Sequence, residues 1–312
     1  MTDRPRRVKL AETGPFFIIH LYAGRRRQGD FHDQINKIIS SSSSPWSSAV
    51  YVLSIDTAID DRMNVHDERL WGFLIDAARA GRILALLLGP PCETWSSARH
   101  AVLLDLEGRQ MRGPRPLRSA TRPWGLSQLS LAELKQLDIG NSLLLRGIWL
   151  SIPVALTGGA VILEHPAPPM QSERAAIWRT GVINLLLREG WLFRRHTFRQ
   201  GHHGACGSKP TSLLHANCCI GDVLSEFAQP MRRNCLEPLI GHDSTGSFKT
   251  SRAKEYPPNL CMCFATAFWR RIESRHFNGG LGEIDFFAKE LAHVSGSVDH
   301  TKSMLPDYQP MR

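Results

Sequence analysis

Short apolar runs, each ending in glycine or a polar residue, recur along the first half of the chain. The clearest are residues 16–21, 49–55, 83–88 and 160–163, which are rich in Ile, Leu, Val and Phe. Continuous apolar runs of this length are typical of strands that are buried on both faces of a sheet. The pattern therefore predicts buried, parallel strands at these positions.

Segments with helical spacing of apolar residues separate or follow these runs. They are residues 31–39, 68–80, 131–152 and 175–188, and a serine-rich loop at 40–48 follows the first of them. Strands alternating with helices predict an α/β domain with a doubly wound, mostly parallel sheet that is covered on both faces. In such a sheet, ligands bind at the carboxyl ends of the strands. The last third of the chain is less regular: residues 200–214 are rich in His and Gly.

The composition allows a large core. Of the 312 residues, 42% are hydrophobic, but no run of eighteen uncharged apolar residues occurs, so we expect no membrane span. The basic residues 1–9 are not followed by an apolar segment with a cleavage site, so we expect no secretory signal. Seven unevenly spaced cysteines predict free thiols and a reducing, intracellular compartment, which would be the nucleus in a eukaryote and the cytoplasm otherwise.

Positive charge is in excess and is clustered. The formal net charge is +9, and basic residues gather at 25–27, 109–122, 194–199 and 232–233. Such clusters suit a polyanionic partner such as DNA, and solvated basic surfaces produce the same pattern. Charge therefore favours a nucleic-acid partner without deciding it.

The segment Gly89-Pro90-Pro91-Cys92 places a thiol on a stiff loop directly after a predicted strand. Taken alone, Cys92 would be interpreted as structural, because a cysteine is more often a small buried side chain than a nucleophile. The segment resembles the Pro-Cys loop of cytosine-C5 DNA methyltransferases. That resemblance implies that the Cys92 thiolate adds to C6 of a flipped cytosine, and that Ser96 and Arg99 in the following loop contact the DNA.

A second element of the family is similar to residues 161–166, where the strand ends in Glu164 followed by His165 and Pro166. The family has Glu-Asn at this place, so His165 stands where asparagine is usual. The resemblance implies that Glu164 contacts N3 and the exocyclic amine of the target base, where a carboxyl group stabilises the charge that builds as the thiolate adds.

Gln200, Gly204 and the run Lys209-Pro210-Thr211 resemble a third element, in the version seen in phage-borne relatives. The more usual version carries two arginines, and His202 occupies the place of the first. The resemblance implies that Gln200, Lys209 and Thr211 hold the substrate, with Lys209 supplying positive charge. A closing segment, residues 253–261, resembles the family's Tyr-Pro-Pro turn before a final helix.

The cofactor loop of the family resembles residues 20–24, which read His-Leu-Tyr-Ala-Gly. The resemblance implies that S-adenosylmethionine binds at Tyr22, Ala23 and Gly24, with Pro90 lining the same site. Asp56 ends the second predicted strand and is placed to bind ribose hydroxyls. The family continues with paired glycines, whereas this chain has arginines at 25–27, and His20 replaces the family's aspartate.

The resemblance covers about residues 16–270 and implies the Rossmann-like fold of S-adenosylmethionine-dependent methyltransferases. We expect a basic arm at 1–15, a catalytic domain at 16–275 containing a small, irregular target-recognition segment at 216–249, and a tail at 276–312. The expected protein is a monomeric DNA (cytosine-5-)-methyltransferase. Its alternatives are a non-catalytic nucleic-acid-binding protein with the same fold and a thiol hydrolase in which His165 activates Cys92.

Three further interpretations concern side chains outside these motifs. The spacing of the His and Cys residues at 202–219 lacks a Cys-x-x-Cys pair, so we expect no metal site. Trp95, beside Cys92, is the better candidate for stacking on a base, whereas Trp191, Phe268 and Trp269 lie in apolar stretches typical of a core. The arginines at 109–122 are candidates for phosphate contacts or for a solvated loop.

Overall fold

Six strands form one mixed sheet in the computed structural model, which describes residues 16–100, 103–104, 109–111, 114–188, 192–231 and 254–275. The spatial order is β2-β1-β3-β6-β8-β7, in which β2, β1, β3 and β6 are parallel and β8 is antiparallel to both of its neighbours. The strands are β1 (Phe16–Leu21), β2 (Val50–Ile55), β3 (Ile83–Leu88), β6 (Ala160–Pro166), β7 (Arg194–Arg199) and β8 (Pro210–Ala216). The prediction of an α/β fold with a mostly parallel sheet is confirmed.

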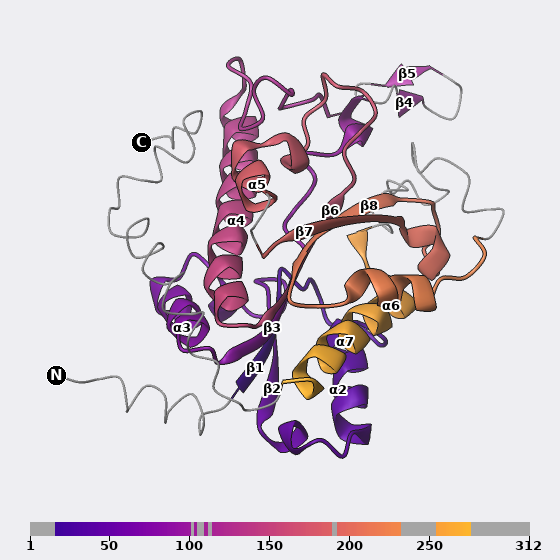
Figure 1. The fold of residues 1–312 in the computed structure, drawn as a ribbon. Coiled ribbons are helices and arrows are strands. Elements are labelled where there is room, and N and C mark those ends of the chain that lie inside the picture. The colour runs from indigo at the N-terminus through magenta and orange to yellow at the C-terminus, as the bar shows by residue number, and fades with distance from the viewer. Residues whose placement is uncertain are drawn as a thin grey trace.

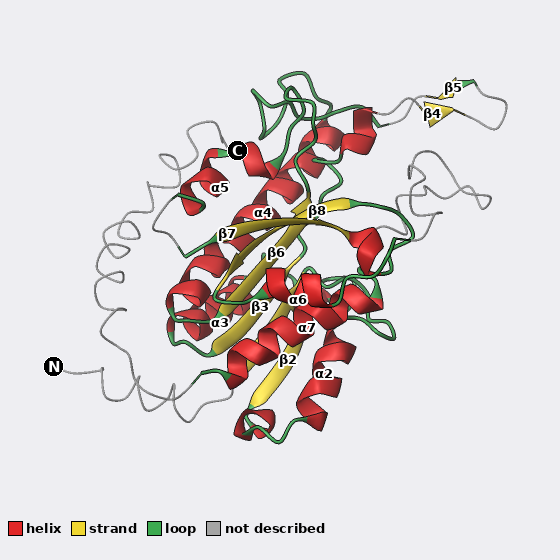
Figure 2. Ribbon diagram, turned by 45° about the vertical axis from the view of Figure 1, so that its right-hand side comes forward, coloured by secondary structure: helices red, strands yellow, loops and turns green. Residues whose placement is uncertain are grey.

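Helices cover both faces of this sheet (Figure 1). One face carries α3 (Glu68–Arg79), α4 (Leu131–Leu156) and α5 (Gly181–Leu186). The other carries α2 (Phe31–Ser41), α6 (Ile220–Glu226) and α7 (Pro258–Glu273). Figure 2 shows the two layers on either side of the yellow strands.

The two-sided cover explains the continuous apolar runs in the sequence. Successive side chains of a strand point to opposite faces, so every position of a central strand needs an apolar side chain. In β3, Leu86 and Leu88 belong to the core beneath α3 and α4, and Leu84 and Leu87 belong to the core beneath α2 and α7. The two cores therefore share the side chains of the same strand.

The longest helix, α4, begins at a capping box. The Ser130 hydroxyl accepts a hydrogen bond from the Glu133 amide, and the Glu133 carboxylate accepts one from the Ser130 amide. Within the described part of the chain, α4 is the one helix long and apolar enough to cross a membrane, and half of that apolar stretch is buried within the fold. It packs against α3, β3 and β6 as a core helix.

Most of the predicted elements occur where the pattern placed them, but the last third differs. The predicted helix at 175–188 is wrong: the structure has a 3-10 turn at Ile177–Arg179 and the short α5. Residues 200–214, predicted as an irregular His- and Gly-rich segment, contain most of β8, and β7 lies directly before them. Two-residue strands, β4 (Leu103–Leu104) and β5 (Gln110–Met111), pair in the predicted arginine-rich loop.

Several sequence-based expectations concern residues outside the described ones. They include the arm at 1–15, the tail at 276–312 and Trp191. Of the expected target-recognition segment at 216–249, residues 216–231 are described, and α6 lies among them.

Candidate active site

The carboxyl ends of β1, β3 and β6 lie side by side, because these strands are neighbours and parallel. Cys92 follows the end of β3 through Gly89-Pro90-Pro91, and Glu164 lies near the end of β6. Since β8 runs in the opposite direction, its first residues meet the last residues of β6, with Thr211 opposite Pro166 and Leu213 opposite Glu164. Segments far apart in the sequence therefore meet at this edge of the sheet.

The Glu164 carboxylate is buried, with 6% of the residue exposed, and is held by three groups. The Gln200 side-chain amide donates to Oε1 at 3.1 Å, and the Tyr256 hydroxyl donates to Oε2 at 3.1 Å. The Lys209 ammonium forms an ion pair with Oε1 at 3.6 Å. A buried carboxylate needs such partners because its desolvation is costly.

The Cys92 thiol shares this electrostatic environment. Burial and the negative charge of Glu164 raise the pKa of Cys92, and the positive charge of Lys209 opposes them, with a net value of about 11. At neutral pH, Cys92 is therefore a thiol and not a thiolate. The structure thus brings together Cys92, Glu164, Gln200 and Lys209, which the sequence indicated as separate motifs.

Lys209 occupies an unusual backbone conformation for its residue type. Its φ angle is 28°, in the left-handed region that residues with a Cβ atom rarely adopt. Strain of this kind persists where the surrounding structure holds it, and it gathers at functional sites. Here it accompanies the approach of the ammonium group to Glu164.

Tyr256 belongs to the site, although the sequence alone assigned no role to it. Its residue is 8% exposed, and its hydroxyl lies so close to Gly89 that a Cβ atom there would stand 2.5 Å from the hydroxyl oxygen. Burial raises the pKa of Tyr256 well above its ordinary value, and the Glu164 charge adds to this. The hydroxyl therefore stays protonated and keeps donating to Glu164. Only the Tyr-Pro-Pro turn pointed to this residue, and nothing local indicated its partner.

The expected cofactor loop lies at the adjoining strand ends. Tyr22 and Gly24 have left-handed backbone with φ of 63° and 67°, and the Gly24 amide donates to Asp56 Oδ2 at 2.9 Å. A Cβ atom at Gly24 would meet nothing within 4 Å, so there is open space beside the loop. A carboxylate and open space at the ends of β1 and β2 fit the ribose of a nucleoside-type cofactor such as S-adenosylmethionine.

Two of the arginines at 25–27 contact other residues of this chain. Arg26 pairs with Asp30 at 2.7 Å, and Arg27 donates to the Tyr256 carbonyl oxygen and lies 3.3 Å from Glu255. These contacts join the loop to α2 and to the turn before α7. His20, which stands in place of an aspartate, packs between Phe31 and Tyr256, and burial lowers its pKa to about 3. It is neutral at physiological pH.

The chain matches no protein-family model, no curated protein and no solved structure. The resemblance to cytosine-C5 DNA methyltransferases therefore stays a prediction.

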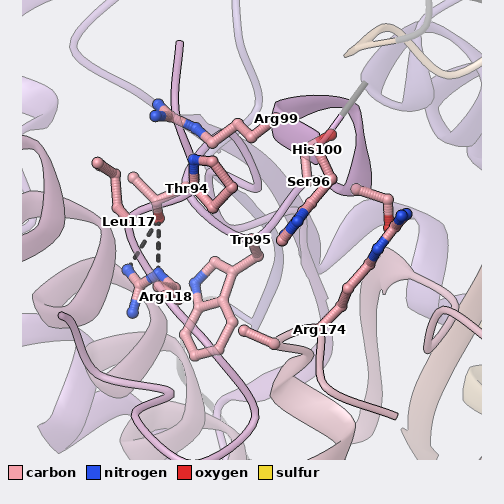
Figure 3. Close-up of a pocket in the computed structure, with 11 residues that line it drawn as sticks. Thr94, Trp95, Ser96, Arg99, His100, Leu117, Arg118 and Arg174 are labelled. Carbon is pink, nitrogen blue, oxygen red and sulfur yellow. Dashed lines mark hydrogen bonds between the residues drawn. The ribbon is translucent and has the colours of Figure 1, made fainter. Parts of the chain in front are cut away.

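The remaining predicted site residues are more enclosed or lie in a neighbouring pocket. Pro90 is buried, and Ala23 is half-buried. Thr211 is fully buried, and its hydroxyl donates to the Lys209 carbonyl oxygen at 3.1 Å. Ser96 and Arg99 line a small pocket formed by the segments 94–100, 116–118 and 174–175 (Figure 3), which we call the Trp95 pocket.

Trp95 itself is 5% exposed, which corrects the prediction that it is available to stack on a base. Its ring packs at 5.9 Å from Trp124 and 6.2 Å from His165, and the Arg118 guanidinium lies 3.9 Å from its ring centre. The loop after Cys92 is therefore anchored in the core by this indole.

The arginines at 109–122 differ in their exposure and in their contacts. Arg118 is 2% exposed, which contradicts both the phosphate-contact and the solvated-loop interpretations for that residue. Arg115 pairs with Glu133 at 2.7 Å, Arg122 donates to the Ser127 hydroxyl, and Arg109 is exposed. Arg112 lies outside the described residues.

The geometry is unfavourable for a thiol hydrolase based on Cys92 and His165. Glu164 and His165 are consecutive in β6 and point to opposite faces, and His165 packs against Trp95. Burial lowers the pKa of His165 to about 3, so it is a weak base.

Among the described residues, no group of three His, Cys, Asp or Glu side chains is placed to hold a metal ion.

Proposed function

We propose that this protein is an S-adenosylmethionine-dependent DNA methyltransferase that acts on C5 of cytosine through a covalent bond to Cys92. The supporting observation is the meeting of Cys92, Glu164, Gln200 and Lys209 at one edge of the sheet. A nucleophile beside a buried, hydrogen-bonded carboxylate is the pair that addition to a pyrimidine requires. The Rossmann-like methyltransferase type of the fold belongs to the same proposal.

In the proposed reaction, the cytosine is flipped out of the duplex, because C6 cannot be reached inside the base stack. The Cys92 thiol would give its proton to water, and its sulfur would form a bond to C6. The C5–C6 π bond breaks in this step, and its electron pair makes C5 nucleophilic. Glu164 holds a proton at N3 and so stabilises the charge that moves into the ring. After C5 has gained a methyl group, loss of the C5 proton and of the S–C6 bond restores the aromatic ring.

Gln200 provides an independent sign that the site receives a hydrogen-bond donor. The residue is fully buried, its amide nitrogen donates to Glu164, and its Oε1 has no hydrogen-bond partner among the described residues. A buried acceptor without a partner is costly unless a ligand supplies a donor. The exocyclic amine of cytosine is such a donor.

S-adenosylmethionine would be held at Tyr22, Ala23, Gly24 and Asp56, and when bound it supplies an electrophilic methyl group. The Asp56 carboxylate oxygens accept hydrogen bonds from the Gly24 and Ala58 amides, and their remaining lone pairs would accept hydrogen bonds from the ribose hydroxyls. Tyr22 is fixed for this task, because its hydroxyl donates to the Leu143 carbonyl oxygen at 2.6 Å.

The alternative is a non-catalytic nucleic-acid-binding protein with the same fold. Two observations favour it: the pKa of Cys92 is about 11, and one oxygen of Asp56 already accepts the Gly24 amide. A protein of this kind would bind DNA and leave S-adenosylmethionine unbound.

The test uses DNA containing 5-fluorocytosine, which cannot lose its C5 substituent as a proton, together with S-adenosylmethionine labelled in the methyl group. We expect the wild-type protein to form a labelled protein–DNA adduct that survives denaturation, and Cys92→Ser to form none. Cys206→Ser, which alters an exposed thiol, is the matched control and should form the adduct normally. DNA binding without adduct or cofactor binding would replace the methyltransferase proposal with the non-catalytic alternative.

A further inference from the structure

The strand β2 forms one end of the sheet (Figure 2), with β1 as its neighbour among the described strands. The Phe16 amide donates to the Ala49 carbonyl oxygen, and the Tyr22 amide donates to the Ile55 carbonyl oxygen. Because successive residues of a strand alternate in direction, the odd-numbered residues of β2 bond to β1 and the even-numbered ones point away from it. The backbone groups that face the open edge are those of Val50, Val52 and Ser54.

This edge lacks the features that usually prevent edge strands from pairing. The sequence of β2 is Val-Tyr-Val-Leu-Ser-Ile, without charge or proline, and its register with β1 continues from end to end without a bulge. Leu53 and Ile55 pack into the core beneath α3, so Tyr51 lies on the same face of the strand, and it is 57% exposed. A flat, apolar edge of this kind favours pairing with another strand.

The side of α3 that faces this edge carries Phe73 between Arg69 and Asp76, which share one side of the helix because of their spacing. The other side of α3 faces α4, where the Arg146 guanidinium lies 4.8 Å from the centre of the Trp71 ring. Since α4 packs on β3 and β6, away from β2, the side with Phe73 is directed toward the open edge. Phe73 is 41% exposed, and the two flanking charges are exposed as well.

We propose that β2 pairs, in antiparallel direction, with β2 of a second copy of this chain, about a two-fold axis through Val52. Val52 then lies opposite its own counterpart, and Val50 lies opposite Ser54 of the other copy, each pair exchanging two hydrogen bonds. The outward-facing backbone groups are symmetric about Val52, so all of them gain partners. The two sheets become one continuous sheet. This dimer takes the place of the expected monomer, and it is independent of the proposed methyl transfer.

The charges on α3 identify a second copy as the partner. The helix lies in the crossover between the parallel strands β2 and β3, so it runs in the opposite direction to them. Arg69 therefore lies toward the carboxyl ends of the strands and Asp76 toward their amino ends. The two-fold axis exchanges these ends, and so sets Arg69 of each copy against Asp76 of the other. Opposite charges face each other twice, as they would not with an arbitrary strand.

The width of the gap between the two α3 helices suits these side chains. The Phe73 ring packs at 5.4 Å from that of Phe17, so each α3 lies near its own β1. Neighbouring strands lie about 4.8 Å apart, which places the two β1 strands about 14 Å apart across the joined β2 pair. Two Phe73 rings at the axis, with the side chains of Arg69 and Asp76 on either side of them, span a gap of this width.

The first experiment measures the association state by sedimentation velocity over a range of protein concentrations. We expect a wild-type dimer that dissociates on dilution. Arg69→Glu and Asp76→Arg each bring like charges together across the axis, and each should raise the dissociation constant by about tenfold or more. The double variant restores opposite charges and should recover most of the affinity.

Arg79→Glu is the matched control, because Arg79 is exposed on the same helix but lies about 80° from Arg69 around its axis. It should leave the dissociation constant unchanged. A wild-type protein that stays monomeric at every concentration would overturn the proposal. A double variant that associates no better than the single variants would do the same.

The second experiment changes the backbone of the edge. Val52→Pro removes an outward N–H group and leaves the bonds to β1 in place, since an edge strand tolerates proline where its N–H group faces solvent. It should abolish the dimer, whereas Val52→Thr keeps both the amide and the branched shape and should retain it. Circular dichroism verifies that both variants are folded. A Val52→Pro variant that is folded and still dimeric would place the interface elsewhere.

Hydrogen exchange of the wild-type protein, followed by NMR, tests the same edge without any substitution. The Val52 and Ser54 amides should become protected as the protein concentration rises, because they are bonded only in the dimer. The Leu53 amide, which faces β1, should be protected at every concentration. If the Val52 amide were protected in the monomer, another part of this chain would cover the edge and the dimer proposal would fail.

Discussion

The Cys92 thiol is held between opposing charges, and its protonation follows from that balance. Burial and Glu164 raise its pKa, to about 11, while Lys209 and Lys254 act to lower it. A thiol with a raised pKa is neutral below that value and becomes a reactive thiolate only as the pH rises through it. The protonated thiol would react at neutral pH only after its environment changed, for example after a bound nucleobase had neutralised the charge of Glu164.

Alkylation of Cys92 should depend on these two neighbours in opposite directions. Glu164→Gln removes a negative charge, so the pKa of Cys92 should fall and its reaction with iodoacetamide at pH 8 should accelerate, about tenfold for each unit of pKa. Lys209→Met removes a positive charge and should slow the reaction. Mass spectrometry of the peptide containing Cys92 measures both rates.

The exposed Cys206 serves as an internal reference in the same samples, because its rate should stay the same in both variants. If the two substitutions changed the Cys92 rate in the same direction, the charge balance described here would be wrong.

Among elements, the end of β3 and the turn before α7 are in close contact at the site. A Cβ atom at Gly89 would stand 2.5 Å from the Tyr256 hydroxyl oxygen and 3.4 Å from the ring carbon that bears it. Gly89→Ala should therefore push Tyr256 away from Glu164 and lower the free energy of unfolding by about 1–3 kcal/mol. Urea denaturation measures this change.

Removing the hydroxyl should relieve the clash. In a Tyr256→Phe background, Gly89→Ala should cost less than it does alone, and the difference is the coupling between the two residues. Gly72→Ala is the control: it lies inside α3 with nothing within 4 Å, and should stabilise the fold by about 0.5–1 kcal/mol. If the two substitutions changed the free energy of unfolding additively, the contact with the Tyr256 hydroxyl would not be the cause of the destabilisation by Gly89→Ala.

The four parallel strands could be predicted from the sequence, and the antiparallel strands β8 and β7 could not. The runs at 16–21 and 83–88 are apolar at every position or nearly so, because both faces of β1 and β3 are covered. The outermost strand β7 has four exposed residues among its six, three of them arginines, so its sequence carries no apolar run. At 175–188, the apolar residues that suggested one helix are buried in a turn and a short helix.

For the site, the sequence predicts the residues that depend on local strand ends, and it does not predict those that depend on distant contacts. Cys92 and Glu164 each follow or end a predicted strand, so a parallel sheet places both at one edge. The roles of Tyr256 and Arg118 arise from contacts across 92 residues to Glu164 and 24 residues to Thr94. No spacing or periodicity near either residue encodes such a partner. Lys209 was predicted from the motif, but its left-handed backbone was not.

At the scale of the whole molecule, two hydrophobic cores share a single sheet. Phe264 of α7 lies in one core and Leu144 of α4 in the other, and β3 contributes side chains to both. Loss of either core would expose one face of the same strands. The described domain should therefore unfold as one unit.

Phe264→Ala and Leu144→Ala test this on opposite faces. Each should lower the free energy of unfolding, by about 3–5 kcal/mol for Phe264 and about 2–5 kcal/mol for Leu144. Both should shift one urea transition that circular dichroism and tryptophan fluorescence report at the same midpoint. Two separate transitions in either variant would show that the cores unfold independently.

The reversed direction of β8 has a consequence for how this site can vary over evolution. Glu164 lies near the end of β6, and Lys209 stands just before the first residue of β8, so the two meet although a long stretch of chain separates them. That stretch leaves the sheet after β6 and returns as β7, the outermost strand, before the η5 turn at Gln200–His203. Insertions before β7 would lengthen an excursion at the periphery without altering the register that sets Glu164 beside Lys209. The chain can thus acquire new surface there while Glu164 and Lys209 keep their spacing.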